Sequence, residues 1–336
     1  MTRVAINGFG RIGRAFLRSV KARAGGELEV VAINDLGEPA NLAYLLTYDT
    51  VYGRAKFAVG HKERALVVDG TDIPLSQEKD PANLPWKERE VDIVIECTGH
   101  FTDAEKARAH INAGAKRVVI TAPGKNGAET ILIGANESAF EGAGEITSNA
   151  SCTTNAISPL IGILDEAIGV ERAILNTTHA YTQSQSLVDG GRTKDVRESR
   201  AAAQNMIPTS TGAAKATALA YPQLKDKFDG ISVRVPVAAG SLADVTFVAK
   251  RSTSVEEVND VLKKASLSAQ WKRVFAVTEE PIVSSDILGL PYGSIADLAM
   301  TRVVDGTLVK VLAWYDNEMG YTHTLVEHVL EVAKRL

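Results

Sequence analysis

The sequence has little of what marks several protein classes. Only two of its 336 residues are cysteine, which excludes a disulfide framework and is typical of a protein from a reducing compartment. The two thiols and six histidines form no CxxC or HxxxH pair, so no metal-site motif is present. We therefore expect no bound metal and a cytoplasmic location.

A charge excess and long apolar runs are absent as well. Lys and Arg number 37 against 41 Asp and Glu, a net charge of −4, which gives no basic surface for nucleic acid or an anionic membrane. No apolar run reaches the ~18 residues of a membrane span, and the first residues read as a strand instead of a signal peptide. We expect a globular protein of about two domains with no membrane or nucleic-acid partner.

The first half alternates short apolar runs with helical patterns. Several runs are apolar on both faces, as in a parallel sheet covered on both sides. The expected strands are 3–7, 28–34, 91–96, 116–121 and 130–135, and the expected helices are 11–24, 39–48 and 102–115. Segment 51–75 is expected to form a hairpin excursion. Strand and helix in alternation predict an α/β fold with a Rossmann-type doubly wound parallel sheet.

The second half has a different pattern. A helix is expected over 153–168 and another over 254–266, among longer strands at 171–181, 230–237, 242–251 and 307–316. This predicts an α+β domain with a mixed or antiparallel sheet. An amphipathic helix ends the chain. The polar stretch 182–205 is poor in core residues, and a loop of that length in a compact domain is usually functional or disordered.

A glycine-rich turn, GFGRIG, follows the first expected strand. Gly8, Gly10 and Gly13 have the G-x-G-x-x-G spacing, and Asp35 ends the next strand 22 residues after Gly13. The glycines allow close approach to a pyrophosphate at a helix N-terminus, and the carboxylate accepts hydrogen bonds from ribose hydroxyls. Asp35 would repel a 2′-phosphate, so NAD is favoured over NADP. The alternative is a tight turn with a surface Asp.

The stretch SNASCTTN places one thiol among hydroxyl and amide residues. Cys152 stands at the expected start of a helix, whose N-terminus would lower the thiol pKa from about 8.5. A nucleophilic thiol needs a base, and His179, at the end of a predicted strand, is the best placed of six histidines. A purely structural His179 remains open at this point. Cys97 ends an apolar strand and is expected to be structural.

Six motifs together resemble one family. INGFGRIGR, SNASCTTN, THAYT, IPTSTGAAKA, RVPV and WYDNEMGY are similar, in order and over the full chain, to phosphorylating glyceraldehyde-3-phosphate dehydrogenases. The resemblance implies that Cys152 attacks the aldehyde of glyceraldehyde 3-phosphate with His179 as acid/base partner. Hydride then passes to NAD, and inorganic phosphate attacks the resulting thioester to give 1,3-bisphosphoglycerate.

The resemblance also implies binding roles, an assembly and domain boundaries. NAD contacts would come from Gly8, Gly10, Arg11, Ile12, Gly13, Asp35, Lys79, Thr121 and Asn317. Phosphate groups would be held by Ser151, Thr153, Thr182, Arg197, Thr211, Gly212 and Arg234. The NAD-binding domain would cover 1–150, completed by a C-terminal helix 318–336, and the catalytic domain 151–317. The loop 182–205 would line a neighbouring subunit's cofactor site in a homotetramer.

Four positions depart from the family pattern. Ala156 stands where a second Cys is common, Met319 replaces Trp, Gly191 replaces Pro in many members, and Glu198 stands where some bacterial members have Arg. These departures bear on loop stiffness, cofactor affinity and the phosphate site. Two alternatives to the implied activity remain. One is erythrose-4-phosphate dehydrogenase, which Thr182 disfavours, and the other is a non-catalytic NAD-binding regulator.

Overall fold

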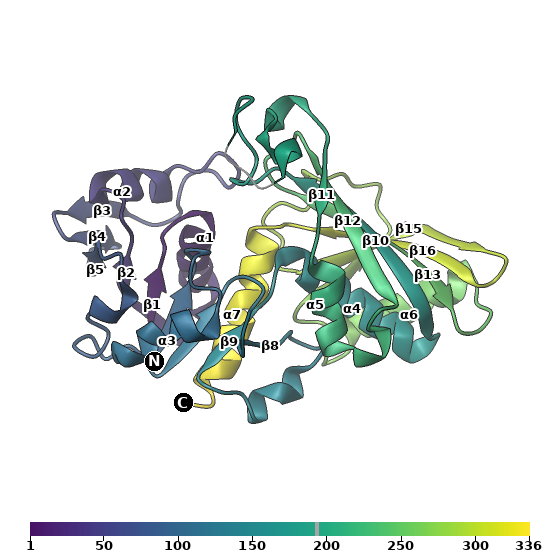
Figure 1. The fold of residues 1–336 in the computed structure, drawn as a ribbon, viewed down its shortest axis with the longest axis horizontal. Coiled ribbons are helices and arrows are strands. Elements are labelled where there is room, and N and C mark those ends of the chain that lie inside the picture. Colours follow the sequence, from purple (N-terminus) through teal and green to yellow (C-terminus); the bar gives the residue numbers. More distant parts are fainter. Residues whose placement is uncertain (192–194) are drawn as a thin grey trace. The chain divides into compact units, whose positions relative to one another are not determined.

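The computed structural model describes residues 1–191 and 195–336, which form two compact units (Figure 1). Unit 1 comprises 1–131, 137–150 and 322–336, and unit 2 comprises 132–136 and 151–321. Residues 192–194 of the polar stretch 182–205 lie outside the described residues, which include its two flanks.

Unit 1 is built on a nine-stranded sheet. The strand order is β3 (Val59–Lys62), β4 (Ala65–Val68), β5 (Thr71–Ser76), β2 (Leu28–Asn34), β1 (Thr2–Asn7), β6 (Ile93–Glu96), β7 (Arg117–Ile120), β9 (Ile146–Ser148) and β8 (Glu129–Thr130). All pairings are parallel except β3–β4 and β4–β5, which form the expected hairpin excursion. The predicted doubly wound parallel sheet is confirmed. Every residue of β6 is buried, as a central strand covered on both faces requires.

Three helices connect the parallel strands of unit 1. They are α1 (Arg11–Ser19), extended by a π-helical turn over Val20–Ala24, α2 (Pro39–Thr47) and α3 (Ala104–Asn112). Pro39 occupies the first turn of α2, where its missing N–H costs nothing. Asp103 caps α3 by accepting a hydrogen bond from the backbone N–H of Glu105 at 2.9 Å. These local signals explain where α2 and α3 begin, α3 two residues after its expected start.

The expected strand at 130–135 is wrong beyond its first residue. Only Glu129–Thr130 is extended, as β8, and 132–136 belong to unit 2. Gly134 has φ +80°, and the ring of Trp271 would lie 2.7 Å from a Cβ at that position. The apolar residues of this run are buried without forming a strand, and periodicity alone does not distinguish such a run from a strand.

Unit 2 has a seven-stranded mixed sheet, as predicted. The order is β11 (Ile207–Ser210), β12 (Phe228–Val235), β10 (Val170–Ala180), β13 (Ser241–Ala249), β16 (Leu308–Tyr315), β15 (Ser294–Val304) and β14 (Phe275–Thr278). The pairs β10–β12 and β14–β15 are parallel and the others antiparallel. Helices α4 (Cys152–Ala167), α5 (Ala213–Ala220) and α6 (Val255–Leu267) lie together along one side of this sheet (Figure 1). On its other face Ile174, Ile231 and Leu308 are exposed.

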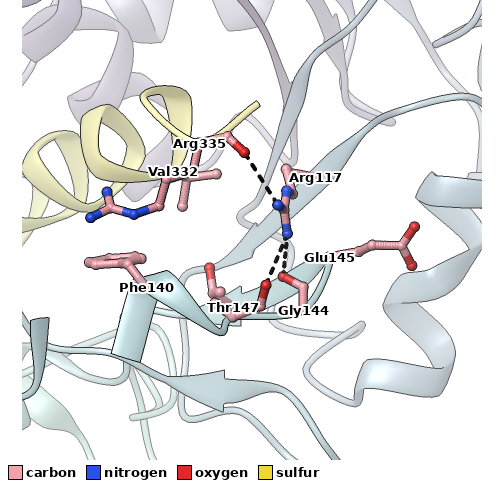
Figure 2. Close-up of a pocket in the computed structure, with 8 residues that line it drawn as sticks. Arg117, Phe140, Gly144, Glu145, Thr147, Val332 and Arg335 are labelled. Carbon is pink, nitrogen blue, oxygen red and sulfur yellow. Dashed lines mark hydrogen bonds between the residues drawn. The ribbon is translucent and has the colours of Figure 1, made fainter. Parts of the chain in front are cut away.

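The last helix, α7 (Met319–Ala333), supplies most of the C-terminal segment of unit 1. His328 lies between Thr147 Oγ1, 2.8 Å from its Nε2, and the carbonyl of Ile131, 3.1 Å from its Nδ1. Figure 2 shows Arg117 donating to the carbonyls of Gly144, at 2.7 Å, and Arg335, at 3.4 Å. The cavity among these residues measures about 10 Å³, room for no more than one water. It is a packing gap between the helix end and β9.

Two kinds of feature are absent from the part of the chain that the structure describes. No helix there is long and apolar enough to cross a membrane. No group of three or more His, Cys, Asp or Glu side chains in those ranges is placed to hold a metal ion.

Candidate active site

The glycine-rich turn of unit 1 has three glycines with different constraints. Gly8 has φ +93°, and a Cβ there would lie 2.8 Å from the backbone nitrogen of Thr98. A Cβ on Gly13 would lie 2.2 Å from the carbonyl oxygen of Gly8. Gly10, which precedes α1, has no atom within 4 Å of its Cβ position among those described. The turn is closed on two sides and open over the helix N-terminus, which fits the pyrophosphate of a dinucleotide.

Asp35 directly follows β2 and faces this turn. Its Oδ2 accepts a hydrogen bond from the Phe9 backbone N–H at 2.6 Å, and its Oδ1 accepts one from Gly37 at 2.8 Å. A carboxylate has about four acceptor positions, so these two bonds orient the group and leave acceptor capacity for two hydroxyls. The arrangement fits the ribose of NAD.

Other expected cofactor residues are placed less uniformly. The Arg11 side chain pairs with Asp49 at 2.5 Å, so α1 offers this residue's backbone N–H to a phosphate more readily than its guanidinium. Thr121 follows β7, and its backbone N–H and hydroxyl donate to the carbonyl of Glu96. Ile12 is half-buried and Lys79 is exposed. In unit 2, Asn317 Oδ1 accepts hydrogen bonds from Gly240 N at 3.1 Å and the Ser241 hydroxyl at 3.0 Å. The amide group of that side chain is thereby oriented.

Cys152 is the first residue of α4 in unit 2. Ser151 caps the helix: its hydroxyl accepts a hydrogen bond from the backbone N–H of Thr154 at 3.1 Å. Asn155 braces the same turn by donating to the carbonyl of Ser151 at 3.0 Å. The polar neighbours of the thiol are thus largely residues that hold the helix start in shape.

The side chain of His179, near the end of β10, lies against the thiol. Its Nε2 is 3.4 Å from Cys152 Sγ, while its Nδ1 is 2.6 Å from both the carbonyl of Ala180 and Nη1 of Arg234. One ring nitrogen cannot both donate to a carbonyl and accept from a guanidinium. When Nδ1–H donates to Ala180, the Nε2 lone pair faces the thiol and can take its proton. When Nδ1 accepts from Arg234, Nε2 carries the hydrogen instead.

The electrostatics of this pair correct one expectation. The helix N-terminus was expected to lower the pKa of Cys152, but burial raises it, with Arg234 and the hydrogen bonds of Thr153 acting in the opposite direction. Burial, followed by the charge of Arg234, lowers the pKa of His179 from 6.5 to about 3. The resting pair is therefore a neutral thiol beside a neutral imidazole, and proton transfer must accompany nucleophilic attack.

The geometry separates His179 from the other five histidines. His110 and His328 are fully buried in unit 1, and His323 lies there 3.3 Å from Arg23. His61 and His100 are exposed. Only His179 among the six lies within hydrogen-bonding distance of Cys152 in the described residues.

Arg234 on β12 is the cation nearest to this pair. It stands opposite His179 in the parallel β10–β12 register. Its Nε is buried and has no hydrogen-bond partner among the described residues. A buried guanidinium N–H without a partner has a strong requirement for an acceptor, so the site fits an anionic group.

Both domain models of one family match the chain. "Glyceraldehyde 3-phosphate dehydrogenase, NAD binding domain" matches residues 2–104, and "Glyceraldehyde 3-phosphate dehydrogenase, C-terminal domain" matches residues 151–317. The chain belongs to the glyceraldehyde 3-phosphate dehydrogenase family. The resemblance stated from the motifs is confirmed.

Curated relatives in this family match along the whole chain. Glyceraldehyde-3-phosphate dehydrogenase 2 of Streptomyces avermitilis is 49% identical over 335 residues, covering 99% of each chain. The Clostridium pasteurianum glyceraldehyde-3-phosphate dehydrogenase is 47% identical over 341 residues, covering 99% of this chain and 100% of the relative. That of Mycobacterium avium is 46% identical over 339 residues, covering 99% of each chain.

Within this family member, the expected phosphate residues fall into several places. Thr182 lies just beyond β10, where its backbone N–H donates to Gln185 Oε1 at 2.8 Å. Gly212 caps α5, with open space at its Cβ position, and the Thr211 hydroxyl accepts a hydrogen bond from Ala213 N at 3.2 Å. Arg197 is exposed. The convergence of these groups and Cys152 on one ligand stays a prediction.

Sequence reasoning missed Tyr315. This buried residue near the end of β16 has its hydroxyl 2.9 Å from Thr153 Oγ1 and 2.7 Å from Thr177 Oγ1. Its ring lies edge-on to His179 with centroids 5.8 Å apart. The Thr153 hydroxyl, expected in a phosphate pocket, therefore has a hydrogen-bond partner inside the protein and keeps capacity for another. The WYDNEMGY motif contained Tyr315, but nothing local indicated which way its ring points.

The four departures have distinct surroundings. Ala156 is fully buried in α4, and Met319 begins α7 with its backbone N–H donating to Asp316 at 3.0 Å. Gly191 is exposed, and no described atom lies within 4 Å of its Cβ position. Glu198 accepts a hydrogen bond from the Thr209 hydroxyl at 2.7 Å. Its carboxylate thus has a partner of its own within unit 2.

Proposed function

We propose that this protein catalyses the NAD-dependent oxidative phosphorylation of D-glyceraldehyde 3-phosphate to 1,3-bisphosphoglycerate. The observation that carries the proposal is the 3.4 Å contact between Cys152 Sγ and His179 Nε2 beside the half-buried Arg234, in a chain of the glyceraldehyde 3-phosphate dehydrogenase family. A thiol, a base and an anion-binding cation in one place suit an aldehyde substrate that carries a phosphate.

The chemistry begins with a proton transfer. Cys152 attacks the aldehyde carbon as its S–H proton moves to His179, and His179 then gives this proton to the former carbonyl oxygen, so that a thiohemiacetal forms. The Cys152 backbone N–H, at the start of α4, is placed to donate to the developing oxyanion. Bound NAD supplies the oxidising capacity by accepting hydride from this carbon. As hydride leaves, His179 takes the hydroxyl proton, and a thioester to Cys152 remains.

Inorganic phosphate completes the reaction. One of its oxygens attacks the thioester carbonyl, the C–S bond breaks, and the acyl phosphate leaves while the Cys152 thiolate regains the proton held by His179. Arg234 and Thr182 would hold the phosphate of the substrate. Arg197, in the same polar stretch 182–205 as Thr182, would also reach a phosphate. Ser151, Thr153, Thr211 and Gly212 would hold the attacking phosphate. The open N-terminus of α5 supports the second assignment, and the partnerless Nε of Arg234 supports the first.

Unit 1 would bind NAD through its glycine-rich turn and Asp35. The turn leaves space over Gly10 for the pyrophosphate, and Asp35 retains acceptor capacity for the ribose hydroxyls. A 2′-phosphate would be repelled by the carboxylate, so NAD is preferred over NADP. Asn317 would donate from its amide to the carboxamide of the nicotinamide, because its carbonyl oxygen is already occupied by Gly240 and Ser241.

A cytoplasmic homotetramer is part of the proposal. The uncovered face of the unit 2 sheet carries the exposed apolar side chains of Ile174, Ile231 and Leu308, and burial against another copy would remove them from water. The described flanks of the polar loop expose Leu187, Val188 and Val196, which supports a contact with a neighbouring subunit. Sedimentation at micromolar concentration would reveal a monomer if this assignment is wrong.

A steady-state assay tests the activity. Purified protein should form NADH from glyceraldehyde 3-phosphate and NAD over many turnovers only when inorganic phosphate is present. Parallel reactions with erythrose 4-phosphate and with NADP should have lower kcat/KM. An equal steady rate without phosphate would overturn the phosphorolysis step, and no NADH under any condition would overturn the activity as a whole.

A further inference from the structure

A buried polar network joins the carboxyl ends of three parallel strands in unit 1. Asn7, Asn34 and Glu96 are the last residues of β1, β2 and β6, and all three side chains are at least nine-tenths buried. Asn34 Nδ2 donates to Asn7 Oδ1 at 2.7 Å, and Asn7 Nδ2 donates to Glu96 Oε2 at 2.6 Å. The glycine-rich turn and Asp35 lie at the carboxyl ends of β1 and β2, beside this network.

Glu96 is the centre of this network. Its Oε2 also lies 3.1 Å from His110 Nε2, and its Oε1 accepts hydrogen bonds from the backbone N–H of Thr98, at 2.8 Å, and from the Thr98 hydroxyl. Four donors thus converge on one carboxylate with 1% of its surface exposed. The pattern suits the ionised form, which only accepts hydrogen bonds.

Trp86 fixes the orientation of His110. The indole Nε1–H donates to His110 Nδ1 at 3.0 Å. Because indole nitrogen is only a donor, Nδ1 must be the accepting nitrogen, and the neutral ring carries its hydrogen on Nε2. That hydrogen points to Glu96. Trp86 and His110 are both fully buried, so the His110 ring keeps a fixed orientation toward the Glu96 carboxylate.

The same network also fixes backbone segments around the glycine-rich turn. Thr98, held by Glu96, has its nitrogen 2.8 Å from the position of a Cβ on Gly8, so the two turns lie directly against each other. Asn34 donates to the carbonyl of Glu78 and accepts from its N–H, both at 2.9 Å, directly before Lys79. The Thr98 segment, the glycine turn and the Glu78 segment are therefore fixed to the same set of side chains.

We propose that Glu96, oriented by His110 and Trp86, is the positioning residue of the NAD site, acting on the cofactor through Thr98 and Asn7 without touching it. The inference rests on the proposed function, since it needs unit 1 to bind NAD. Loss of the carboxylate leaves donors facing donors, so the turns at Gly8 and Thr98 separate and the cofactor is held less well.

The test compares two network variants with a matched control. In Glu96→Gln the side-chain size is kept but one oxygen acceptor becomes a donor, and in Trp86→Phe the donor to His110 is lost. The control is Thr147→Val, which removes another buried hydrogen bond of unit 1, to His328. Calorimetric titration of each full-length, NAD-free protein with NAD gives Kd, and steady-state kinetics give KM for NAD and kcat. Thermal melting reports stability separately.

We expect Glu96→Gln to weaken NAD binding about ten-fold and Trp86→Phe about three-fold, with kcat at saturating NAD retained. Thr147→Val should lower the melting temperature and leave Kd for NAD unchanged. If Glu96→Gln does not fold, Trp86→Phe carries the comparison because it leaves the carboxylate in place.

The wild-type measurement distinguishes a failure of the proposed function from a failure of the role proposed for Glu96. Wild-type protein that binds no NAD would overturn the proposed function. Wild-type protein that binds NAD, with network variants that bind as tightly or lose no more affinity than Thr147→Val, would overturn only the role of Glu96. A parallel fall of kcat and NAD affinity in Glu96→Gln would likewise count against a pure positioning role.

Discussion

The two thiols of the chain have contrasting neighbours. Cys97 follows β6 in unit 1, where burial raises its pKa and the adjacent Glu96 carboxylate raises it further. Burial also raises the pKa of Cys152 at the start of α4 in unit 2, but Arg234 and Thr153 act to lower it. Burial alone makes a thiol inert. A nearby cation, hydrogen-bond donors and an imidazole make a buried thiol usable as a nucleophile.

Substitution of each thiol is the strongest test of this contrast. Cys152→Ser should reduce kcat by about three or more decades, because a hydroxyl is a far poorer nucleophile than sulfur in this setting. Cys97→Ser should retain most of the activity. Steady-state NADH formation measures both. A Cys152→Ser enzyme with near wild-type kcat would show that the reaction does not pass through this side chain.

The imidazole is the second part of the contrast. His179→Asn should lower kcat by about 100-fold or more, because the proton of Cys152 then has no acceptor at 3.4 Å. The exposed His61 gives a matched control, and His61→Asn should leave kcat unchanged. Equal rates in the two variants would mean that the Cys152–His179 contact has no part in catalysis.

Alkylation compares the thiols without substitution. Iodoacetamide at pH 8 should modify Cys152 about ten-fold or more faster than Cys97, because Arg234 stabilises one thiolate and Glu96 disfavours the other. Mass spectrometry of the digested protein over a time course gives both rates. Faster labelling of Cys97 would reverse the comparison, and Arg234→Met should reduce the difference between the two.

Acid stability extends the comparison to a histidine in each unit. Burial is the main cause that lowers the pKa of both His179 and His328 from 6.5 to about 3. Between these values the unfolded chain binds protons that the folded chain does not. The stability from the neutral rings is fully present above pH 6.5 and falls as the pH drops toward 3, by about 1.4 kcal/mol per pH unit for each proton.

His328→Gln tests this effect. Melting temperatures between pH 7 and pH 4 should fall less steeply in the variant than in the wild type, although the variant starts from a lower value at pH 7. The exposed His61→Gln is the control and should keep the wild-type slope. A variant slope as steep as that of the wild type would show that His328 binds its proton in the folded state.

The sequence allowed much of the architecture to be predicted because its signals are local. The glycine spacing and the apolar strands each act within a few residues, and the elements they predict are present. The run at 130–135 was misjudged because its turn at Gly134 fits against Trp271, far away in the sequence. Tyr315 was missed for the same reason, since its partners Thr153 and Thr177 are joined to it only by the fold.

In the candidate site, too, features with a local sequence signal were predicted and features that depend on the fold were not. The helix-start position of Cys152 indicated a nucleophile, the family motifs indicated His179 as its base, and the structure brings the two together. The direction of the Cys152 pKa shift was wrong because a helix N-terminus is visible in sequence whereas the depth of burial is not. Glu96 was counted only as a strand residue, since a carboxylate in an apolar run has no local sign of the four donors that meet it.

The position of α7 at the end of the chain also determines when unit 1 can complete its folding during synthesis. Unit 1 contains the first 131 residues and yet needs residues 322–336, which supply His328 to Thr147 and Arg335 to Glu141. On the ribosome, β9 and the Phe140 segment emerge well before these partners exist. The nascent amino-terminal half must wait through the synthesis of the whole of unit 2, with apolar surface uncovered, before its last contacts can form. A chain released before residue 322 would lack the segment that closes that surface.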